Sequence, residues 1–216
     1  MSRAAARDTS LYGTLKAAYK MVRHLPDRML HRRRHLEARQ RLLKLQTIRT
    51  ILVVCHGNIC RSPYLEAVLQ RALPGVAVTS AGMVGPNRPV PDHSLSLAAE
   101  RGLDLSGFRS RPVSRMDARE MDVVIVMDPA QGRYLTRVLG VSPRRIVVAG
   151  DLDPRSSPTR AIRDPWRQSR DVFRTAFDRL DRCAATIVKL MPYAVRSSSR
   201  PLNSTPSGSA PQKAWP

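Results

Sequence analysis

The 216-residue sequence has few cysteines and contains no long apolar segment. Its three cysteines, Cys55, Cys60 and Cys183, are an odd number without the spacing of a disulfide framework, so we expect reduced thiols. No apolar run approaches the roughly 18 residues that cross a bilayer, and the start lacks the continuous apolar core of a signal peptide. These absences predict a cytoplasmic protein that is at most peripheral at a membrane.

Acidic residues are also scarce, because 17 Asp and Glu stand against 37 Lys and Arg and give a formal net charge of +20. Residues 1–50 hold thirteen basic and three acidic side chains, so half of the excess lies in an N-terminal arm. The arm has no aromatic residues interleaved with its arginines and no nucleic-acid motif, which argues against nucleic acid as its partner.

Residues 1–48 nevertheless carry an ordered pattern. Apolar residues recur every seven positions, at Leu15, Val22, Met29, Leu36 and Leu43. This spacing predicts one or two amphipathic helices, interrupted near Pro26, with a strongly basic polar face. We therefore assign residues 1–48 as a basic amphipathic helical extension. Two roles are open for it: packing on its own domain, or binding an anionic membrane surface or an acidic partner.

After the arm, strand and helix patterns alternate as far as residue 190. Apolar runs predict four strands, at residues 51–54, 76–80, 122–127 and 145–149. Helical spacing and boundary signals predict helices at residues 64–72, 92–101, 129–139 and 172–190. Strands separated by helices predict a three-layer α/β fold, in which a four-stranded parallel sheet has helices on both faces. We place the folded domain at residues 49–192 and a disordered tail, rich in Ser, Pro and Arg, at residues 193–216.

One short stretch, Cys55 to Pro63, joins the first predicted strand to the first helix and has the sequence C-H-G-N-I-C-R-S-P. In open α/β sheets such a loop lies at the carboxyl ends of the strands, where ligands bind. Successive backbone N–H groups and the helix dipole form an anion site there. Cys55 is placed to ionise and attack, and Arg61 to close the loop around a phosphate. The stretch therefore predicts a phosphate-binding loop that contains a nucleophile.

The pattern C-x-G-N-x-C-R-S-P between a strand and a helix resembles the signature of the low-molecular-weight protein tyrosine phosphatases. Three shorter segments resemble other parts of that family, namely Ser80–Gly82, Arg109–Arg111 and Val126–Asp128. The resemblance extends over roughly residues 50–190 and includes neither terminal extension. It implies the family's fold and the hydrolysis of phosphotyrosine in a protein substrate.

A phosphatase of this kind needs a carboxylic acid to protonate the departing phenolate. Two Asp-Pro pairs occur late in the chain, at Asp153 and Asp164. Only the second is followed by an aromatic residue, Trp166, and it lies shortly before the last predicted helix, as does the acid loop of the family. We therefore assign Asp164 as the acid.

The resemblance implies a two-step displacement that requires no metal and no cofactor. Cys55 attacks phosphorus and forms a phosphocysteine, Asp164 acts as acid and then as base, and Arg61 holds the phosphoryl oxygens. Ser62 should hydrogen-bond the Cys55 sulfur, and Asn58 should hold the backbone of the loop. The expected substrate-binding residues are His56, Gly57, Asn58, Ile59, Cys60, Ser62 and Trp166.

Two rival functions share these features. Some arsenate reductases use the same fold, but they need two further cysteines on a segment after the second strand, and residues 83–112 contain none. A non-catalytic module that binds phosphoproteins would not need both Cys55 and Asp164. The physiological substrate and the oligomeric state stay open.

Overall fold

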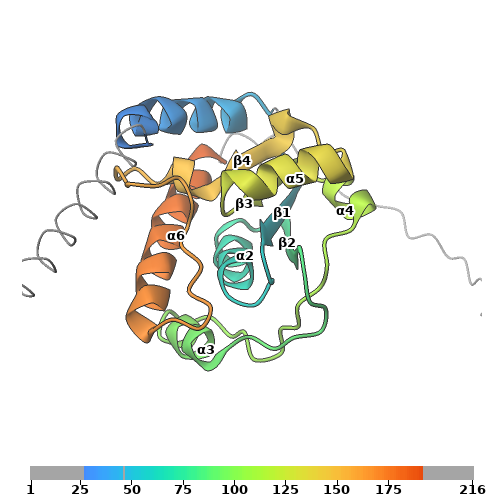
Figure 1. Ribbon diagram of the computed structural model, residues 1–216. Coiled ribbons are helices and arrows are strands. Elements are labelled where there is room, and N and C mark those ends of the chain that lie inside the picture. Colours follow the sequence, from blue (N-terminus) through green and yellow to red (C-terminus); the bar gives the residue numbers. More distant parts are fainter. Residues whose placement is uncertain (1–26, 46, 192–216) are drawn as a thin grey trace, which may run out of the picture.

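The computed structural model describes residues 27–45 and 47–191 and has a parallel sheet at its centre (Figure 1). The strands are β1 (Thr50–Cys55), β2 (Ala77–Gly82), β3 (Val123–Val126) and β4 (Ile146–Val148), in the order β2-β1-β3-β4. Val53 of β1 is the register partner of Ser80 in β2 and of Ile125 in β3. Each predicted strand is present, with its ends within two residues of the predicted ones.

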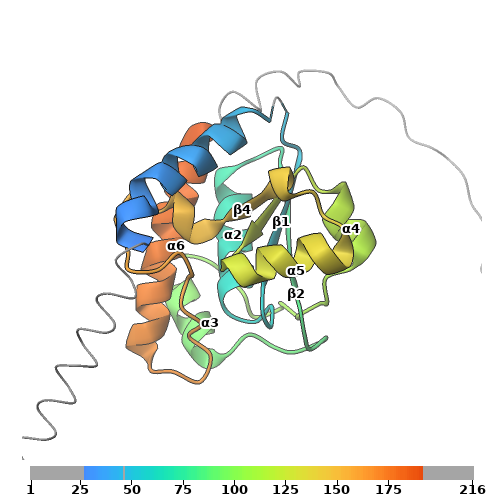
Figure 2. The ribbon, with the colours of Figure 1, turned by 45° about the horizontal axis from the view of Figure 1, so that its top comes forward.

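Helices cover both faces of the sheet, as predicted. On one side lie α2 (Arg61–Ala72), α3 (Asp92–Ala99) and α6 (Arg170–Leu190), and on the other lie α4 (Arg115–Glu120) and α5 (Pro129–Leu139) (Figures 1 and 2). Short 3-10 helices at Pro143–Arg145 and Ala149–Leu152 flank β4.

The side chains of β1 alternate between the two layers of the core. Ile51 and Val53 belong to the buried cluster that includes residues of α2 and α6, whereas Leu52 and Val54 belong to the cluster that includes Leu135 of α5. This alternation follows from the two-residue period of a strand. Because β1 is buried on both faces, it reads as a continuous apolar run in the sequence.

A further helix, at residues 27–43, packs beside β4 and the 3-10 helix Ala149–Leu152 (Figure 2). Its inner face buries His31, Ala38 and Leu42. Ring N–H groups of His31 and His35 donate to backbone carbonyls of the segment after β4, at 3.0 Å and 2.9 Å. This part of the arm is therefore joined to the domain by both apolar and polar contacts.

The apolar stripe that the sequence indicates in the arm is not the face that packs. Met29, Leu36 and Leu43 are 73%, 51% and 52% exposed, so they lie on the outer side of the helix. The stripe's first two members, Leu15 and Val22, lie outside the described residues, as do the break expected near Pro26 and the tail expected at residues 193–216. Among the helices that the structure describes, none has the length and apolar character to cross a membrane.

Candidate active site

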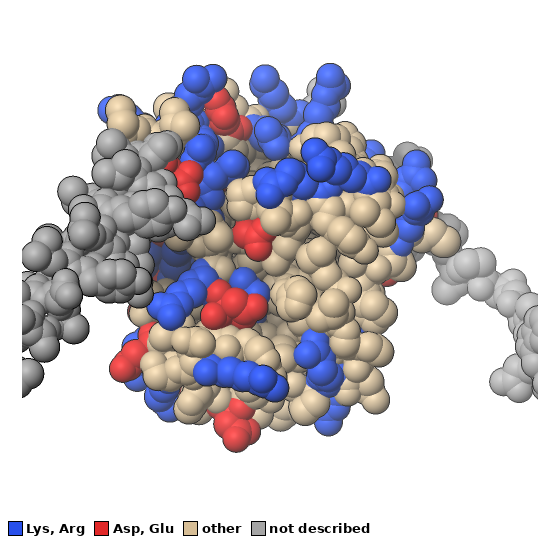
Figure 3. Space-filling model, in the orientation of Figure 1, with Lys and Arg blue, Asp and Glu red and all other residues tan. Residues whose placement is uncertain are grey.

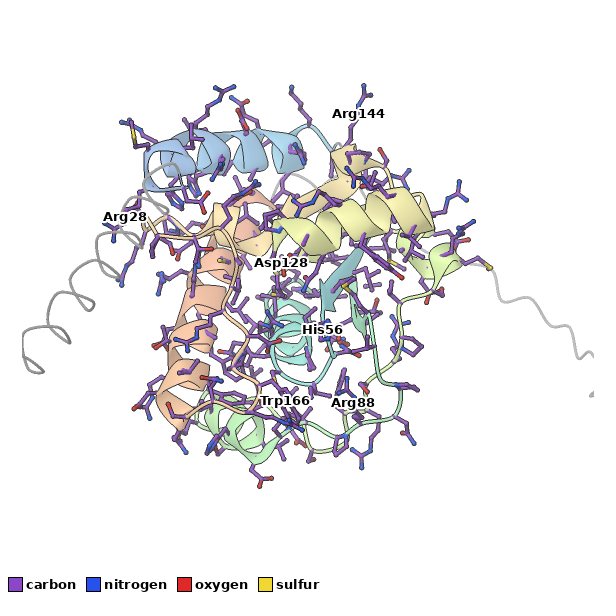
Figure 4. All side chains as sticks on the ribbon, in the orientation of Figure 1. Arg28, His56, Arg88, Asp128, Arg144 and Trp166 are labelled. Carbon is purple, nitrogen blue, oxygen red and sulfur yellow. The ribbon has the colours of Figure 1, made fainter. Side chains whose placement is uncertain are left out.

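Cys55 ends β1, and the loop that follows leads directly into α2. The cysteine is only 2% exposed and lies at the carboxyl edge of the sheet. The N-terminus of α2 faces the same loop, and helix N-termini attract anions because their N–H groups are free of intrahelical partners. Figure 4 shows His56 on this loop together with Arg88 and Trp166, which line the same pocket.

Two donors point at the Cys55 sulfur. The backbone N–H of Asn58 lies 3.1 Å from Sγ, and the hydroxyl of Ser62 lies 3.0 Å from it. The side-chain amide of Asn58 donates to Ser62 Oγ at 2.9 Å, which leaves the hydroxyl hydrogen for the sulfur. Both donors are therefore placed to hydrogen-bond a sulfur that carries negative charge during a reaction.

Asn58 also holds the loop in an unusual conformation. Its φ of 51° is left-handed, a region that Asn tolerates better than most residues. Its side chain donates to Ser80 Oγ at 2.7 Å and accepts from the backbone N–H of Arg111 at 2.9 Å. A Cβ on Gly82 would lie 2.9 Å from the Asn58 Cβ, so the glycine permits this close approach. The segments Ser80–Gly82 and Arg109–Arg111 therefore contact the loop through Asn58 and help to hold its backbone.

Arg61 is almost fully buried, with 4% of its surface exposed. Its Nη1 donates to the carbonyl of Ile162 at 2.9 Å, and its Nη2 donates to the Asp164 carboxylate at 2.5 Å. Its Nε has no hydrogen-bond partner within the part of the chain that the structure describes. A guanidinium held in this way can receive two oxygens of a phosphate, one at Nε and one at Nη2.

Asp153, the other Asp-Pro residue, does not line the pocket and is 1% exposed. Arg179 and Arg182 of α6 pair with its carboxylate at 3.2 Å and 2.9 Å. Burial opposes its ionisation, but hydrogen bonds from Arg182 and from the backbone of Arg155 hold the pKa of Asp153 below its usual value. Asp153 thus ties α6 to the segment after β4, and Asp164 is the carboxylate at the pocket.

The pocket has a volume of about 170 Å³. Most of the expected site residues line it, but Asn58 and Ser62 do not, because they lie beneath the loop and support Cys55. The sequence interpretation missed two lining residues, Val84 and Arg88, from the segment after β2. The full lining is Cys55, His56, Gly57, Ile59, Cys60, Arg61, Val84, Arg88, Asp164 and Trp166.

Side chains around the reacting group differ in their exposure. His56 is exposed, whereas Ile59 and Cys60 are buried. Burial raises the pKa of the Cys60 thiol to about 12, so this cysteine is protonated at neutral pH. Trp166 is 44% exposed at the rim, and the Arg167 guanidinium lies 5.7 Å from its ring centroid. In the described part of the chain, no three His, Cys, Asp or Glu side chains are grouped to hold a metal ion.

A phosphate monoester in this pocket would meet a thiol that can act as nucleophile, a guanidinium that can receive its oxygens and a carboxyl group that can protonate its leaving group. That combination defines the class of cysteine-dependent phosphatases. Residues 50–196 match the family described as low molecular weight phosphotyrosine protein phosphatase. The chain therefore belongs to this family and is a protein tyrosine phosphatase, a hydrolase of phosphoric monoesters.

Individual relatives agree with the family assignment. The low molecular weight protein-tyrosine-phosphatase Wzb of Escherichia coli strain K12 is 36% identical over 140 residues, which cover 62% of this chain and 89% of that protein. The structure of Wzb from Escherichia coli K30 in complex with sulphate has a TM-score of 0.61 at 27% identity, and covers 66% of this chain and 98% of its own. Vibrio vulnificus Wzb in complex with benzylphosphonate has a TM-score of 0.60 at 30% identity, with the same coverage of 66% and 98%.

Proposed function

We propose that the chain hydrolyses phosphotyrosine through a phosphocysteine on Cys55, with Arg61 as phosphate receptor and Asp164 as general acid and base. The observation that carries this proposal is the convergence of these three side chains on one small pocket. The exposed indole of Trp166 at the rim offers an aromatic face to the substrate phenyl ring.

In the first step, substrate binding changes the partner of Arg61. Phosphoryl oxygens take Nε and Nη2 of the guanidinium, and the Asp164 carboxyl leaves Nη2 for the phenolic oxygen. The Cys55 thiolate then attacks phosphorus, so that an S–P bond forms while the bond from phosphorus to the phenolic oxygen breaks. Asp164 gives its proton to the departing oxygen.

In the second step, the same groups reverse their roles. Asp164, now a carboxylate, removes a proton from a water molecule as the water oxygen bonds to phosphorus. The S–P bond breaks, and the departing thiolate accepts hydrogen bonds from the Asn58 N–H and the Ser62 hydroxyl. The product is inorganic phosphate, and the enzyme returns to its starting state.

Peptide hydrolysis tests this proposal against its rivals. The wild type should release phosphate from a phosphotyrosine peptide in preference to a matched phosphoserine peptide, with and without a chelator. Cys55→Ser should lose at least about a thousandfold of this activity, because the nucleophile is gone. Thiol-dependent reduction of arsenate without peptide hydrolysis would establish the reductase, and tight binding without turnover would establish the binding module.

The role of Asp164 has its own test. Asp164→Asn should slow the hydrolysis of aryl phosphates with poor leaving groups far more than that of activated aryl phosphates. The reason is that a poor leaving group depends most on protonation. Asp153→Asn provides the comparison, since it is expected to lower stability without changing this dependence. If Asp153→Asn showed this dependence on the leaving group and Asp164→Asn did not, Asp153 would be the acid.

We further propose that the enzyme is cytoplasmic and that the arm attaches it to an anionic membrane surface. The inner face of helix 27–43 packs on the domain, which leaves Met29, Leu36 and Leu43 outward. Lys and Arg side chains gather over this helix and over α5 (Figure 3). Apolar residues flanked by basic ones are the pattern of interfacial helices, in which each basic residue near the surface contributes about 1 kcal/mol. An acidic protein partner would match the charge but would not need the apolar stripe.

Sedimentation with phosphatidylserine vesicles tests the attachment. The variant Met29→Ser/Leu36→Ser/Leu43→Ser should bind at least about tenfold more weakly than the wild type, because three apolar side chains no longer enter the lipid. A control changes an exposed apolar residue on α4, Met116→Ser, and should bind normally. Added salt should weaken wild-type binding. Equal binding by the stripe variant and the control would contradict the proposal and favour an acidic protein partner.

A further inference from the structure

Arg88 contacts the catalytic loop from the segment between β2 and α3, and its contact is made to one particular peptide group. Its Nη2 donates to the carbonyl oxygen of Gly57 at 2.8 Å. The N–H of the same peptide group belongs to Asn58 and lies 3.1 Å from the Cys55 sulfur. Because a trans peptide is planar, the direction of its C=O fixes the direction of its N–H. The contact made by Arg88 therefore fixes the direction in which the Asn58 N–H points at the Cys55 sulfur.

The guanidinium of Arg88 is itself held in place. Its Nε donates to the carbonyl of Gly85 at 3.2 Å, and its Nη2 also donates to the carbonyl of Val84 at 3.0 Å. The backbone N–H of Arg88 donates to Ser110 Oγ at 2.9 Å. Arg88 thus binds carbonyls on both sides of the pocket mouth, and it has little freedom to leave Gly57.

Two glycines make room for this guanidinium. A Cβ on Gly57 would lie 2.7 Å from Arg88 Nη2, and a Cβ on Gly85 would clash with Arg88 Nε. Gly85 also has a left-handed φ of 72°. The glycine of the loop signature therefore leaves room for the Arg88 guanidinium to reach the loop.

The charge of Arg88 acts in the same direction as its geometry. A cation at the oxygen end of a peptide group polarises the group, which strengthens the hydrogen bond that its N–H makes at the other end. That bond favours the charged form of the sulfur. The effect passes through the peptide group, and no direct contact between Arg88 and the sulfur is required.

We propose that Arg88 is a positioning residue for the reaction: it aims and polarises the Gly57–Asn58 peptide so that its N–H stabilises the Cys55 thiolate. This inference rests on the proposed role of Cys55 as the nucleophile. Two other roles would have different consequences. A purely structural contact would change stability without changing the pH dependence of the cysteine, and a contact with substrate would raise KM alone.

The test compares Arg88→Met and Arg88→Lys with the control Arg109→Met. Arg109 lies on the neighbouring segment, where its side chain donates to the carbonyls of Ser106 and Phe108 within its own turn. The control removes the same charge and leaves the Gly57 carbonyl bonded. Thermal melting first confirms that each variant is folded. If Arg88→Met does not fold, Arg88→Lys takes its place in the test, because it keeps a cation at this position but lacks the guanidinium.

The main readout is alkylation of Cys55 by iodoacetamide as a function of pH, with the labelled residue identified by peptide mass mapping. On the acid side of the alkylation profile, Arg88→Met should react about tenfold more slowly than wild type. At higher pH, where the thiol is ionised in both proteins, the two rates should converge. In Arg88→Met, the acid side of the kcat/KM profile should also move to higher pH. Arg88→Lys should show a smaller shift of both profiles, and Arg109→Met should show no shift.

Unchanged alkylation profiles, or a rise in KM with unchanged profiles, would overturn the proposal. Alkylation does not require turnover, so it assesses Arg88 independently of the proposed catalytic cycle. If Cys55→Ser retained activity, the proposed function would fail while the alkylation result still stood by itself. The two failures are therefore distinguishable.

Discussion

Replacing Asn58 by alanine tests how the catalytic loop keeps its shape. Asn58 is fully buried, and its side chain makes three hydrogen bonds, to Ser62 Oγ, to Ser80 Oγ and from the Arg111 N–H. At about 1 kcal/mol each, these bonds contribute about 3 kcal/mol to the free energy of unfolding. Its left-handed φ of 51° adds roughly 1 kcal/mol when alanine must adopt it. We therefore expect Asn58→Ala to lower the free energy of unfolding by about 4 kcal/mol.

The chain offers a matched control for this change. Asn87 has a similar φ of 56° but is exposed, and its side chain makes no hydrogen bond to the residues that the structure describes. Asn87→Ala should therefore cost only the backbone contribution of about 1 kcal/mol. Urea unfolding of both variants measures the difference, and the activity of Asn58→Ala on a small aryl phosphate should fall as well. If the two variants were equally stable, the reasoning about the buried hydrogen bonds would be refuted.

Three further predictions concern the surroundings of the loop. Gly82→Ala should lower activity at least about tenfold, because the new Cβ would lie 2.9 Å from Asn58 Cβ and displace the loop; normal turnover would contradict this. Cys60→Ser should prevent recovery of activity by dithiothreitol after peroxide, because Cys60 lines the same pocket and its thiol can condense with a sulfenic acid on Cys55 to give a disulfide and water; equal recovery would count against it. Asp153→Asn should cost about 3 kcal/mol or more in urea unfolding at pH 7, because Arg179 and Arg182 lose a buried partner.

The Asp153 prediction also has a pH dependence with a definite sign. The folded pKa of Asp153 lies below its unfolded value, so its ionisation stabilises the folded state above the unfolded pKa of about 3.9. That stability is lost as the pH falls through the lower, folded pKa. The stability difference between wild type and Asp153→Asn should therefore be full near neutral pH and should shrink below about pH 4. A difference that stays constant down to acid pH would contradict this account.

The sheet and most helices could be predicted because their signals are local. Buried parallel strands are continuous apolar runs, and the predicted helix at residues 129–139 has the observed ends of α5. There, Asp128 caps the first turn and Gly140 ends the helix in a left-handed conformation. The short helix α4 was missed, because its six residues bury only Ala118 and so show no apolar period.

The candidate site was predictable only where short sequence motifs mark its residues. The loop from Cys55 onward has a recognisable pattern of its own, and a second short pattern, Asp-Pro followed by the aromatic Trp166, pointed to Asp164, which does line the pocket. Arg88 carries no such signal, because arginine is common in this chain and the contact with Gly57 depends on how two loops fold together. In the arm, apolar spacing predicted a helix but not which face packs, since His31 supplies part of the buried side.

The phosphocysteine is the central claim, and acid quench of a reaction tests it most directly. Asp164→Ala enzyme mixed with an activated aryl phosphate, p-nitrophenyl phosphate, should accumulate the intermediate, because this leaving group departs without the acid whereas loss of the base slows hydrolysis of the intermediate. Rapid acid quench, digestion and mass spectrometry then locate the phosphate. The account predicts a phosphorylated peptide with the modification on Cys55 and none in Cys55→Ser. Phosphate on another residue, or turnover with no covalent phosphoenzyme at any time point, would contradict it.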